Sequence, residues 1–408
     1  MRAPLSPLVF FQRAVRIFGD RTAVIDGDVR LTYREFAARC ERLARGLRGL
    51  GIDPGDRVAV LSPNTHRALE CYYAVPLAGG VLVPLNTRLG PSDYRYILSH
   101  SGAKAILADP TFADLAVSLR QVLPSLQLVL LSGETAAARN AGRGEEVLYS
   151  EDLTERQRLS GDGVFRQGLI DVDELDEEAL ITLNYTSGTT ANPKGVMLTH
   201  RNTALNVLDF IIHGRLTVND IYLHTLPMFH VNGWGGVWAV TAVGATHVCL
   251  PKIDPAHIVH LIDSLGVTMA CSAPTVLVML GSDPATANWR PKHAVRWYVG
   301  GAPPPAALIR RMEHELGFEI VHVYGLTETS PWLTVCEWRD EWNSLSPEER
   351  ARIKARQGIG QILTGEVRVV RPDLTDVAPD GHEVGEIVVR GPTVMKGYYK
   401  DPEATAEA

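Results

Sequence analysis

The fold of this chain is decided by the stretch Leu180-Ile-Thr-Leu-Asn-Tyr185 and by the loop Thr186-Ser-Gly-Thr-Thr-Ala-Asn-Pro-Lys-Gly195 that follows it directly. The first stretch is apolar enough for a buried strand, whereas the loop combines Gly, Ser and Thr with one lysine. A strand that runs into such a loop places hydroxyls, backbone N–H groups and a cation where phosphates can be held. The pair therefore predicts an α/β fold with a phosphate-binding loop at the end of a strand.

The loop has the spacing of a Walker phosphate loop but not its chemistry. Gly188 and Lys194 have the separation that a Walker loop requires. Pro193, however, stands where the second glycine would donate a backbone N–H, and Gly195 replaces the Ser or Thr that would bind magnesium. A phosphate loop of another type is therefore predicted.

Amphipathic helices and short apolar strands alternate on both sides of this loop. One helix is predicted behind Ser6 and Pro7, and a second follows the capping-box pair Thr32 and Glu35 until Gly51 stops it. Strands are predicted at Val58-Ala-Val-Leu61, Val81-Leu-Val83, Thr246-His-Val-Cys-Leu250, Val267-Thr-Met-Ala-Cys271, Val295-Arg-Trp-Tyr-Val299 and Glu319-Ile-Val-His-Val-Tyr324. Strands that alternate with helices in this way indicate a largely parallel sheet.

The chain after Gln357 has a different pattern, in which the turn-rich Ala378-Pro-Asp-Gly381 separates the alternating strands Glu366-Val-Arg-Val-Val370 and Gly385-Glu-Ile-Val-Val-Arg390. The sequence thus predicts two packed α/β subdomains with largely parallel sheets in a layered arrangement, plus a small antiparallel β-barrel-like subdomain. The predicted divisions are residues 1–178, which end in an acidic connector, residues 179–335 with the phosphate loop, and residues 336–408.

Composition excludes several classes of protein. The 408 residues are 45% hydrophobic and 21% charged, with a net charge of −7, so neither bulk disorder nor a nucleic-acid partner is expected. The five cysteines form no Cys-x-x-Cys pair, which argues against a disulfide framework and against a zinc site. A reducing compartment fits this pattern, and a cytoplasmic location is predicted.

The segment Val231–Leu250 carries no charged residue and is long enough to cross a bilayer. It also holds Asn232, His247, two threonines and four glycines, with little Leu or Ile. A buried segment of a large α/β domain is therefore predicted, rather than a transmembrane helix.

Further motifs accompany the loop that ends in Pro-Lys-Gly, and they follow one another in order along the chain. They are Leu31-Thr-Tyr33, Pro227-Met-Phe-His-Val-Asn-Gly-Trp234, Gly300-Gly-Ala-Pro-Pro304, Tyr324-Gly-Leu-Thr-Glu-Thr329 and Val394-Met-Lys-Gly-Tyr-Tyr-Lys-Asp-Pro-Glu-Ala-Thr405. With this set the chain resembles the adenylate-forming, or AMP-binding, enzymes, whose signature is the loop ending in Pro-Lys-Gly, and within them the fatty acyl-CoA synthetases. The resemblance implies ATP-dependent activation of a carboxylic acid, through an acyl-adenylate, to an acyl-CoA.

The resemblance also implies roles for individual residues toward ATP. The β- and γ-phosphates would be held by Thr186, Ser187, Gly188, Thr189, Thr190 and Lys194. Gly301, Ala302 and Pro303 would lie along the adenine, with Tyr324 stacked on it and Gly325 beside it. Thr327 would hydrogen-bond the α-phosphate, and Glu328 would help to hold Mg²⁺. The implied catalytic set is Thr327, Glu328, Lys194 and His230.

The acid-binding side can be argued from composition. An enzyme that activates amino acids needs a carboxylate for the substrate ammonium, but Pro227–Leu250 contains no Asp or Glu. The stretch is apolar and partly lined by glycine, which suits an alkyl or aryl chain. The predicted acid-binding residues are His230, Val231, Trp234, Gly235, Gly300 and Gly325. Two alternatives stay open, because His230 could be a buried, hydrogen-bonded histidine and Trp234 could either line the pocket or gate it.

The expected substrate is a medium- or long-chain fatty acid, with coenzyme A as the thiol. Alternatives are an aryl-acid ligase, an acyl-carrier-protein ligase, or a non-catalytic nucleotide- or acyl-binding fragment. The sequence is also compatible with a homodimer. In the family, a ribose-binding aspartate and a small domain with a catalytic lysine follow the segment that resembles Lys400–Ala408. The resemblance therefore implies a large N-terminal domain without its C-terminal lid domain, and we expect the 408-residue chain alone to be inactive.

Overall fold

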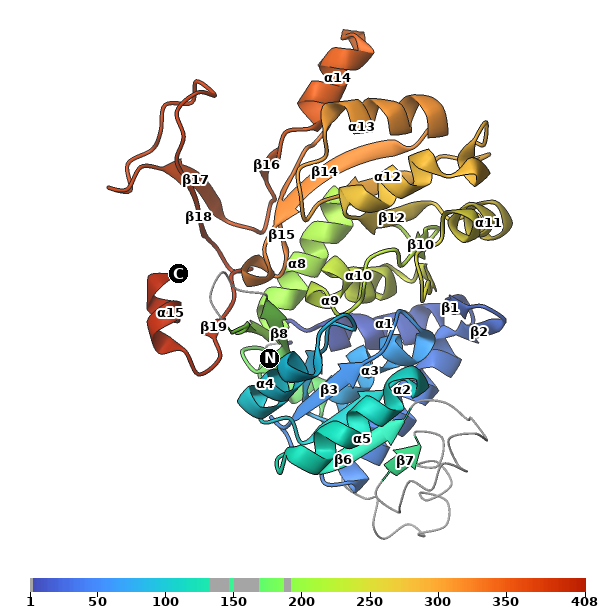
Figure 1. The fold of residues 1–408 in the computed structure, drawn as a ribbon, viewed down its shortest axis with the longest axis vertical. Helices are drawn as coiled ribbons and strands as arrows, with labels where there is room; N and C mark the ends of the chain where they lie inside the picture. Colours follow the sequence, from blue (N-terminus) through green and yellow to red (C-terminus); the bar gives the residue numbers. More distant parts are fainter. Residues whose placement is uncertain (1–2, 132–146, 150–168, 187–191) are drawn as a thin grey trace.

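The computed structural model describes residues 3–131, 147–149, 169–186 and 192–408. Two β-sheets enclose a layer of helices, and further helices cover the outer face of each sheet (Figure 1). The predicted α/β class, with two layered and largely parallel sheets, is confirmed.

The first sheet has eight strands within the described ranges, in the order β19-β9-β8-β4-β3-β5-β6-β7. They are β3 (Arg57–Leu61), β4 (Val81–Pro84), β5 (Ala105–Ala108), β6 (Leu128–Leu131), β7 (Val147–Tyr149), β8 (Leu180–Thr186), β9 (Lys194–Thr199) and β19 (Gly397–Tyr398). The strands from β8 to β7 pair in parallel, whereas β9 pairs antiparallel with both β8 and β19. The predicted strands at 58–61, 81–83 and 180–185 are therefore neighbours in this sheet.

The second sheet has nine strands in the same described ranges, in the order β16-β15-β14-β13-β12-β10-β11-β1-β2. They are β1 (Thr22–Asp26), β2 (Val29–Thr32), β10 (Ile221–Leu223), β11 (Thr246–Val248), β12 (Met269–Ser272), β13 (Arg296–Val299), β14 (Glu319–Gly325), β15 (Trp332–Val335) and β16 (Ile359–Gly360). Pairing is parallel from β1 to β14 and antiparallel at both edges.

The helices form three layers. The inner layer contains α1 (Pro7–Phe18), α2 (Tyr33–Gly49), α3 (His66–Leu77), α8 (His200–His213) and α10 (Gly236–Val243). The outer face of the first sheet carries α4 (Pro91–Ser101) and α5 (Ala113–Val122), and that of the second carries α11 (Pro255–Leu265), α12 (Pro274–Ser282) and α13 (Ala306–Arg311), with α14 (Pro347–Lys354) beside α13. The short helices α9 (Val231–Trp234) and α15 (Pro402–Glu407) complete the described set.

Two predicted helix starts are confirmed in atomic detail. The Ser6 side chain accepts a hydrogen bond from the backbone N–H of Leu8, with Pro7 as the first residue of α1. Thr32 and Glu35 form the predicted capping box at the start of α2. Both caps satisfy backbone donors that would otherwise lack partners at the end of a helix.

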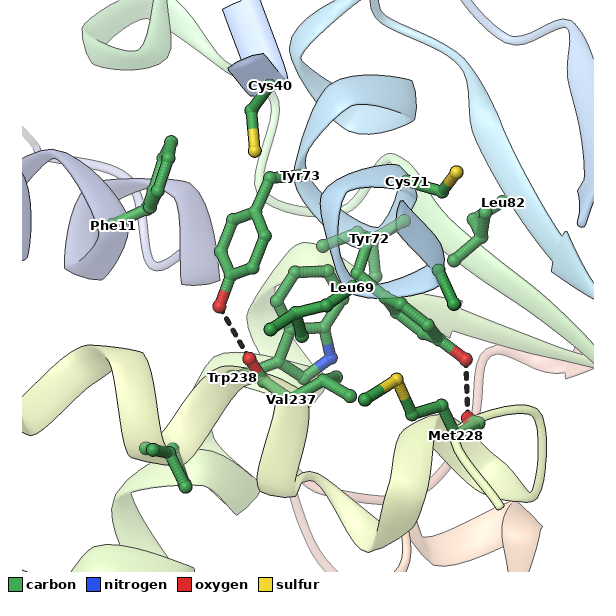
Figure 2. Close-up of a cluster of buried hydrophobic side chains, with 14 of the residues drawn as sticks. Phe11, Cys40, Leu69, Cys71, Tyr72, Tyr73, Leu82, Met228, Val237 and Trp238 are labelled. Carbon is green, nitrogen blue, oxygen red and sulfur yellow. Dashed lines mark hydrogen bonds between the residues drawn. The ribbon is translucent and has the colours of Figure 1, made fainter. Parts of the chain in front are cut away.

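The inner layer packs around a group of aromatic side chains on α3 (Figure 2). The centroid of the Tyr73 ring lies 4.4 Å from the centroid of the Phe11 ring and 5.1 Å from that of Trp238 on α10. Its hydroxyl donates to the carbonyl of Val237 at 2.5 Å, and the neighbouring Tyr72 donates to the carbonyl of Met228. These bonds join α3 to both ends of the segment 228–237.

The C-terminal segment departs from its predicted form. Strands β17 (Glu366–Val370) and β18 (Glu386–Arg390) pair antiparallel as predicted, but they form an open two-stranded ribbon rather than a closed barrel. The other short strands of this segment extend the two large sheets instead, because β16 pairs with β15 and β19 pairs with β9. Each large sheet also takes strands from both sides of residue 178, and the predicted domain divisions stay predictions.

We predict that Tyr73→Phe lowers the free energy of unfolding by about 1–2 kcal/mol, because it leaves the buried carbonyl of Val237 without this donor. Urea denaturation measures the change. The matched control is Tyr96→Phe, whose side chain is only partly buried, and it should change stability by less than about 0.5 kcal/mol. Equal losses in the two variants would contradict the importance of this bond.

Candidate active site

A cavity of about 510 Å³ lies where the ends of β8 and β14 approach each other across the two sheets. Most of the predicted site residues that the structure describes line it, namely Thr186, Lys194, His230, Val231, Trp234, Gly300, Gly301, Tyr324, Gly325, Thr327 and Glu328. Ala302 and Pro303 are exposed on the loop after β13, and Gly235 is buried behind the lining residues. Ser187, Gly188, Thr189 and Thr190 lie outside the described residues.

The side of the cavity that is predicted to bind phosphates is bordered by the β8–β9 pair. Thr186, the last residue of β8, lies opposite Lys194, the first residue of β9, so the predicted phosphate loop begins and ends at one edge of the first sheet. The ammonium nitrogen of Lys194 lies 4.8 Å from the centre of the Tyr398 ring. A cation over an aromatic face is attracted by the ring quadrupole. Tyr398 therefore holds the lysine at the mouth of the loop.

Glu328 lies directly after β14, at the end of the second sheet that faces the cavity. Its Oε1 accepts a hydrogen bond of 2.8 Å from the Tyr398 hydroxyl, and its backbone carbonyl accepts one of 2.7 Å from the N–H of Met395. Burial and the hydrogen bond to Glu328 raise the pKa of Tyr398, so the phenol stays protonated and donates at neutral pH.

The donor set at Glu328 can be tested against Mg²⁺. The described residues contain no group of three or more His, Cys, Asp or Glu side chains placed to hold a metal ion. A single carboxylate that lines a cavity large enough for a nucleotide's phosphates matches the way Mg²⁺ is usually bound, through one or two carboxylates plus phosphate oxygens and water. Glu328 therefore fits a cation that is shared with a bound nucleotide.

The predicted acid side of the cavity contains an unusual backbone turn. Five consecutive residues from Val231 to Gly235 have positive φ, at 36°, 58°, 55°, 50° and 79°. Three of them carry a side chain, and for Val231 in particular this conformation is a true outlier. The turn directs Val231 and Trp234 into the cavity lining next to His230.

The Trp234 indole rests on the backbone of the second sheet. A Cβ atom added to Gly300 would lie 2.8 Å from the indole and 2.6 Å from the carbonyl oxygen of Val323, so only glycine fits there. Trp332 also donates from its indole N–H to the Trp234 carbonyl at 3.0 Å. Trp234 is 6% exposed, and its ring therefore occupies part of the apolar end of the cavity.

His230 is exposed to the cavity, unlike the buried, hydrogen-bonded histidine of the alternative interpretation. The surrounding protein atoms disfavour the charged ring and lower the pKa of His230 below 6.5. This shift favours the neutral form of the imidazole. His224 and His247, by contrast, are buried and do not line this cavity. Their ring nitrogens form a hydrogen bond of 2.9 Å with each other.

Sequence reasoning missed several residues that line the cavity, among them Tyr398, Asn184 and Trp332. Tyr398 contacts both Lys194 and Glu328, and Asn184 and Trp332 also line the cavity. Tyr398 lies in a quoted motif, but nothing in its local pattern shows that β19 pairs with β9 and brings it to the lysine. Asn184 did carry a signal, because a polar residue in an otherwise buried strand needs a hydrogen-bond partner.

Comparison with known proteins agrees with this geometry. Residues 11–399 match the AMP-binding enzyme family. A 2-methylpropanoate–CoA ligase, CCL4, from Humulus lupulus is 40% identical over 412 residues, which cover 100% of this chain and 72% of that protein. Benzoate–CoA ligase from Arabidopsis thaliana is 40% identical over 414 residues, which cover 99% of this chain and 70% of that protein. The chain therefore belongs to the AMP-binding enzyme family.

Solved structures give the same result. A putative long-chain-fatty-acid CoA ligase from Rhodopseudomonas palustris superposes with a TM-score of 0.82 at 27% identity, covering 99% of this chain and 93% of that one. The anthranilate CoA ligase AuaEII has a TM-score of 0.83 at 21% identity, covering 100% of this chain and 74% of that one, which supports the fold alone. Its membership in this family and its similarity to CoA ligases show that the chain is an acid–CoA ligase. The roles of the individual site residues stay predictions.

No helix in the described ranges has both the length and the apolar character needed to cross a membrane. The segment Val231–Leu250 instead forms α9, α10 and β11, which are almost entirely buried inside the protein, as predicted.

We predict that the His230 imidazole titrates below its ordinary pKa of 6.5, because desolvation penalises the charged ring. The ring should therefore stay neutral at pH 7 and gain its proton only as the pH falls below 6.5. NMR titration of the histidine Cε1–H signals measures this, with His230 assigned by the signal that His230→Phe removes. A midpoint at or above 6.5 would contradict the prediction.

Proposed function

We propose that this chain binds ATP and a carboxylic acid with an uncharged tail, in an enzyme that forms the acyl-adenylate and transfers the acyl group to coenzyme A. That the 408-residue chain alone is inactive stays a prediction. One observation carries the proposal. The cavity brings Lys194, Thr327 and Glu328, which suit phosphate chemistry, into the same space as His230 and Trp234, which suit an apolar acid.

In the first step, a carboxylate oxygen attacks the α-phosphorus of ATP and pyrophosphate leaves. Negative charge develops on the phosphate oxygens, so positioned positive groups and donors lower the barrier. Lys194 would supply a cation on the phosphate side, and the Thr327 hydroxyl would donate to the α-phosphate. A Mg²⁺ ion held by Glu328 would neutralise further phosphate charge when bound.

In the second step, the thiolate of coenzyme A attacks the acyl carbonyl carbon of the adenylate and AMP leaves with the bonding electrons. The neutral His230 ring borders the same space and would pack beside the acyl carboxyl group. A neutral imidazole there adds no positive charge that would bind the ionised carboxylate of the free acid more tightly than the uncharged acyl group of the adenylate.

We propose a compact acid, either short and branched or aromatic, as the substrate class. Trp234 fills part of the apolar end of the cavity and is held against Gly300, which leaves limited length for an alkyl chain. Relatives of similar identity are named for 2-methylpropanoate, 4-hydroxybutyrate and benzoate. A medium- or long-chain fatty acid is the second candidate, because the similar solved structure from R. palustris is named as a long-chain-fatty-acid CoA ligase.

The substrate class can be tested with acyl-sulfamoyl adenosines, which are stable analogues of acyl-adenylates. We predict that the benzoyl and 2-methylpropanoyl analogues bind more tightly than the palmitoyl analogue by isothermal calorimetry. Trp234→Ala should reverse this order by opening the apolar end of the cavity. Tighter palmitoyl binding by the unaltered chain would favour the second candidate, and no binding of any analogue would refute the proposed function.

The phosphate roles can be tested separately from acid binding. We predict that Lys194→Ala weakens Mg·ATP binding by about tenfold or more, because it removes a cation that faces the phosphates. Glu328→Gln should abolish the dependence of ATP affinity on Mg²⁺ concentration. Lys292→Ala, an exposed lysine before β13, is the matched control and should change neither quantity. Unchanged ATP binding in both site variants would contradict these roles.

Carrier protein as the acyl acceptor, a purely ligand-binding role, a cytoplasmic location and a homodimer stay predictions. Comparing thioester formation with coenzyme A and with an acyl-carrier protein separates the first of these from the proposed function.

A further inference from the structure

The left-handed turn of residues 231–235 needs an explanation, because most of its residues carry a Cβ atom. Such residues rarely adopt positive φ, and the three in this turn, Val231, Asn232 and Trp234, make it costly unless the surroundings enforce it. The turn is nevertheless the segment that places His230 and Trp234 in the cavity. Whatever enforces the turn therefore also sets the shape of the acid side.

Both ends of this segment are fixed by tyrosines of α3. Tyr72 donates to the carbonyl of Met228, and Tyr73 donates to the carbonyl of Val237 (Figure 2). These bonds limit where the segment begins and ends. They do not reach residues 231–235 themselves. The indole N–H of Trp332 donates to the Trp234 carbonyl near the end of the turn, so its middle, at Asn232, requires a further contact.

The middle of the turn is held by a closed ring of three hydrogen bonds. The Thr182 hydroxyl donates to the Asn184 amide oxygen at 2.8 Å, and the Asn184 amide donates to the Asn232 amide oxygen at 3.2 Å. The Asn232 amide then donates to the Thr182 hydroxyl oxygen at 3.2 Å. Each group donates once and accepts once around the ring, an arrangement in which hydrogen bonds strengthen one another.

The ring is fully enclosed and belongs to two different parts of the site. Thr182, Asn184 and Asn232 are 0%, 3% and 3% exposed, so loss of any member would leave buried polar atoms unpaired. Thr182 and Asn184 point to the same side of β8, two residues apart, and β8 ends at Thr186 where the predicted phosphate loop begins. Asn232 stands in the turn between His230 and Trp234.

We infer that Asn232 is a positioning residue, which holds the left-handed turn against β8 and thereby fixes His230 and Trp234 relative to the phosphate side of the cavity. The inference rests on the proposed function. In this interpretation, the hydrogen bonds between Thr182, Asn184 and Asn232 hold the bound acid at a fixed position relative to the nucleotide. Asparagine is suited to this position because it tolerates positive φ better than other residues with a side chain, and because its amide can donate and accept at once.

A purely structural role would have a different signature. If the ring only satisfied buried polar groups, its loss would lower stability and would leave the relative affinities of the folded protein for its two ligands unchanged. A positioning role requires the acyl end of the site to lose affinity while the nucleotide alone still binds. The two roles can therefore be separated by measuring both ligands on the same folded variant.

The main test is Asn232→Gly, which keeps a backbone that accepts positive φ but removes the amide. The probes are Mg·ATP and the acyl-sulfamoyl adenosine that the unaltered chain binds most tightly, both measured by calorimetry. We expect about tenfold or greater loss for the acyl probe and less than about twofold change for Mg·ATP. The matched control is Asn288→Gly, an exposed asparagine with φ of 61°, which should change neither affinity.

A second pair of variants keeps the test decisive if Asn232→Gly does not fold. Thr182→Val removes one hydroxyl from the ring at nearly constant volume, and we expect about threefold to tenfold loss for the acyl probe. Thr182→Ser restores the hydroxyl and should recover the affinity. Thr286→Val, which removes another buried hydroxyl remote from the cavity, should lower stability without changing either affinity.

The outcomes are distinct. If the unaltered chain binds no acyl analogue, the proposed function is refuted, and this outcome differs from any result that refutes the positioning role of Asn232. If the folded variants Asn232→Gly and Thr182→Val bind the acyl probe as the unaltered chain does, or if they lose both ligands equally, the positioning role is refuted. Selective loss of the acyl probe with recovery in Thr182→Ser supports it.

Discussion

The antiparallel pairing of β9 with β8 is the constraint on which the site depends. The strands from β8 to β7 run in parallel, but β9 reverses direction at once and places Lys194 opposite Thr186. The loop between them is thereby closed at one edge of the sheet. Because β9 is then left with a free edge, β19 can pair with it, and a segment almost two hundred residues later in the chain brings Tyr398 to the lysine. The reversal of direction between β8 and β9 thus brings together Thr186, Lys194 and Tyr398, although Tyr398 is far from the other two in the sequence.

The second sheet contributes the acid side through a different kind of constraint. Its parallel strands deliver Gly300 and Glu328 to the edge that faces β8, but the apolar wall comes from a turn whose backbone is unfavourable for most of its residues. Buried tyrosines fix the ends of that turn, and Asn232 bonds its middle to the strand that precedes the phosphate loop. Local strain persists where surrounding contacts over-determine the conformation, and here those contacts come from both sheets and from the helix layer between them.

The sequence was a good guide to elements and a weaker guide to their partners. Ser6 and the Thr32–Glu35 pair mark helix starts because capping depends on residues only a few positions apart. The predicted strands are present for a similar reason, since burial leaves a local apolar pattern. Strand pairing, by contrast, joins residues far apart in the chain and leaves no pattern in the local sequence. The open ribbon of β17 and β18, and the recruitment of β16 and β19 by the large sheets, depend on which edges are free after folding. Most site residues were found through motifs, whereas Tyr398 and Asn184 act through distant partners.

Tyr398 shows how such a distant partner can prepare a site for a highly charged ligand. Its ring face meets the Lys194 ammonium, and its hydroxyl donates to the Glu328 carboxylate. One neutral side chain therefore stabilises a cation and an anion through different parts of its surface, and it does so without forming a direct bond that neutralises either charge. Because Tyr398 keeps its proton, neither interaction is lost near neutral pH. The lysine and the carboxylate are thus positioned beside the cavity by a neutral side chain. In the proposed function, their charges would remain available for the phosphates of a nucleotide and for a cation bound with them.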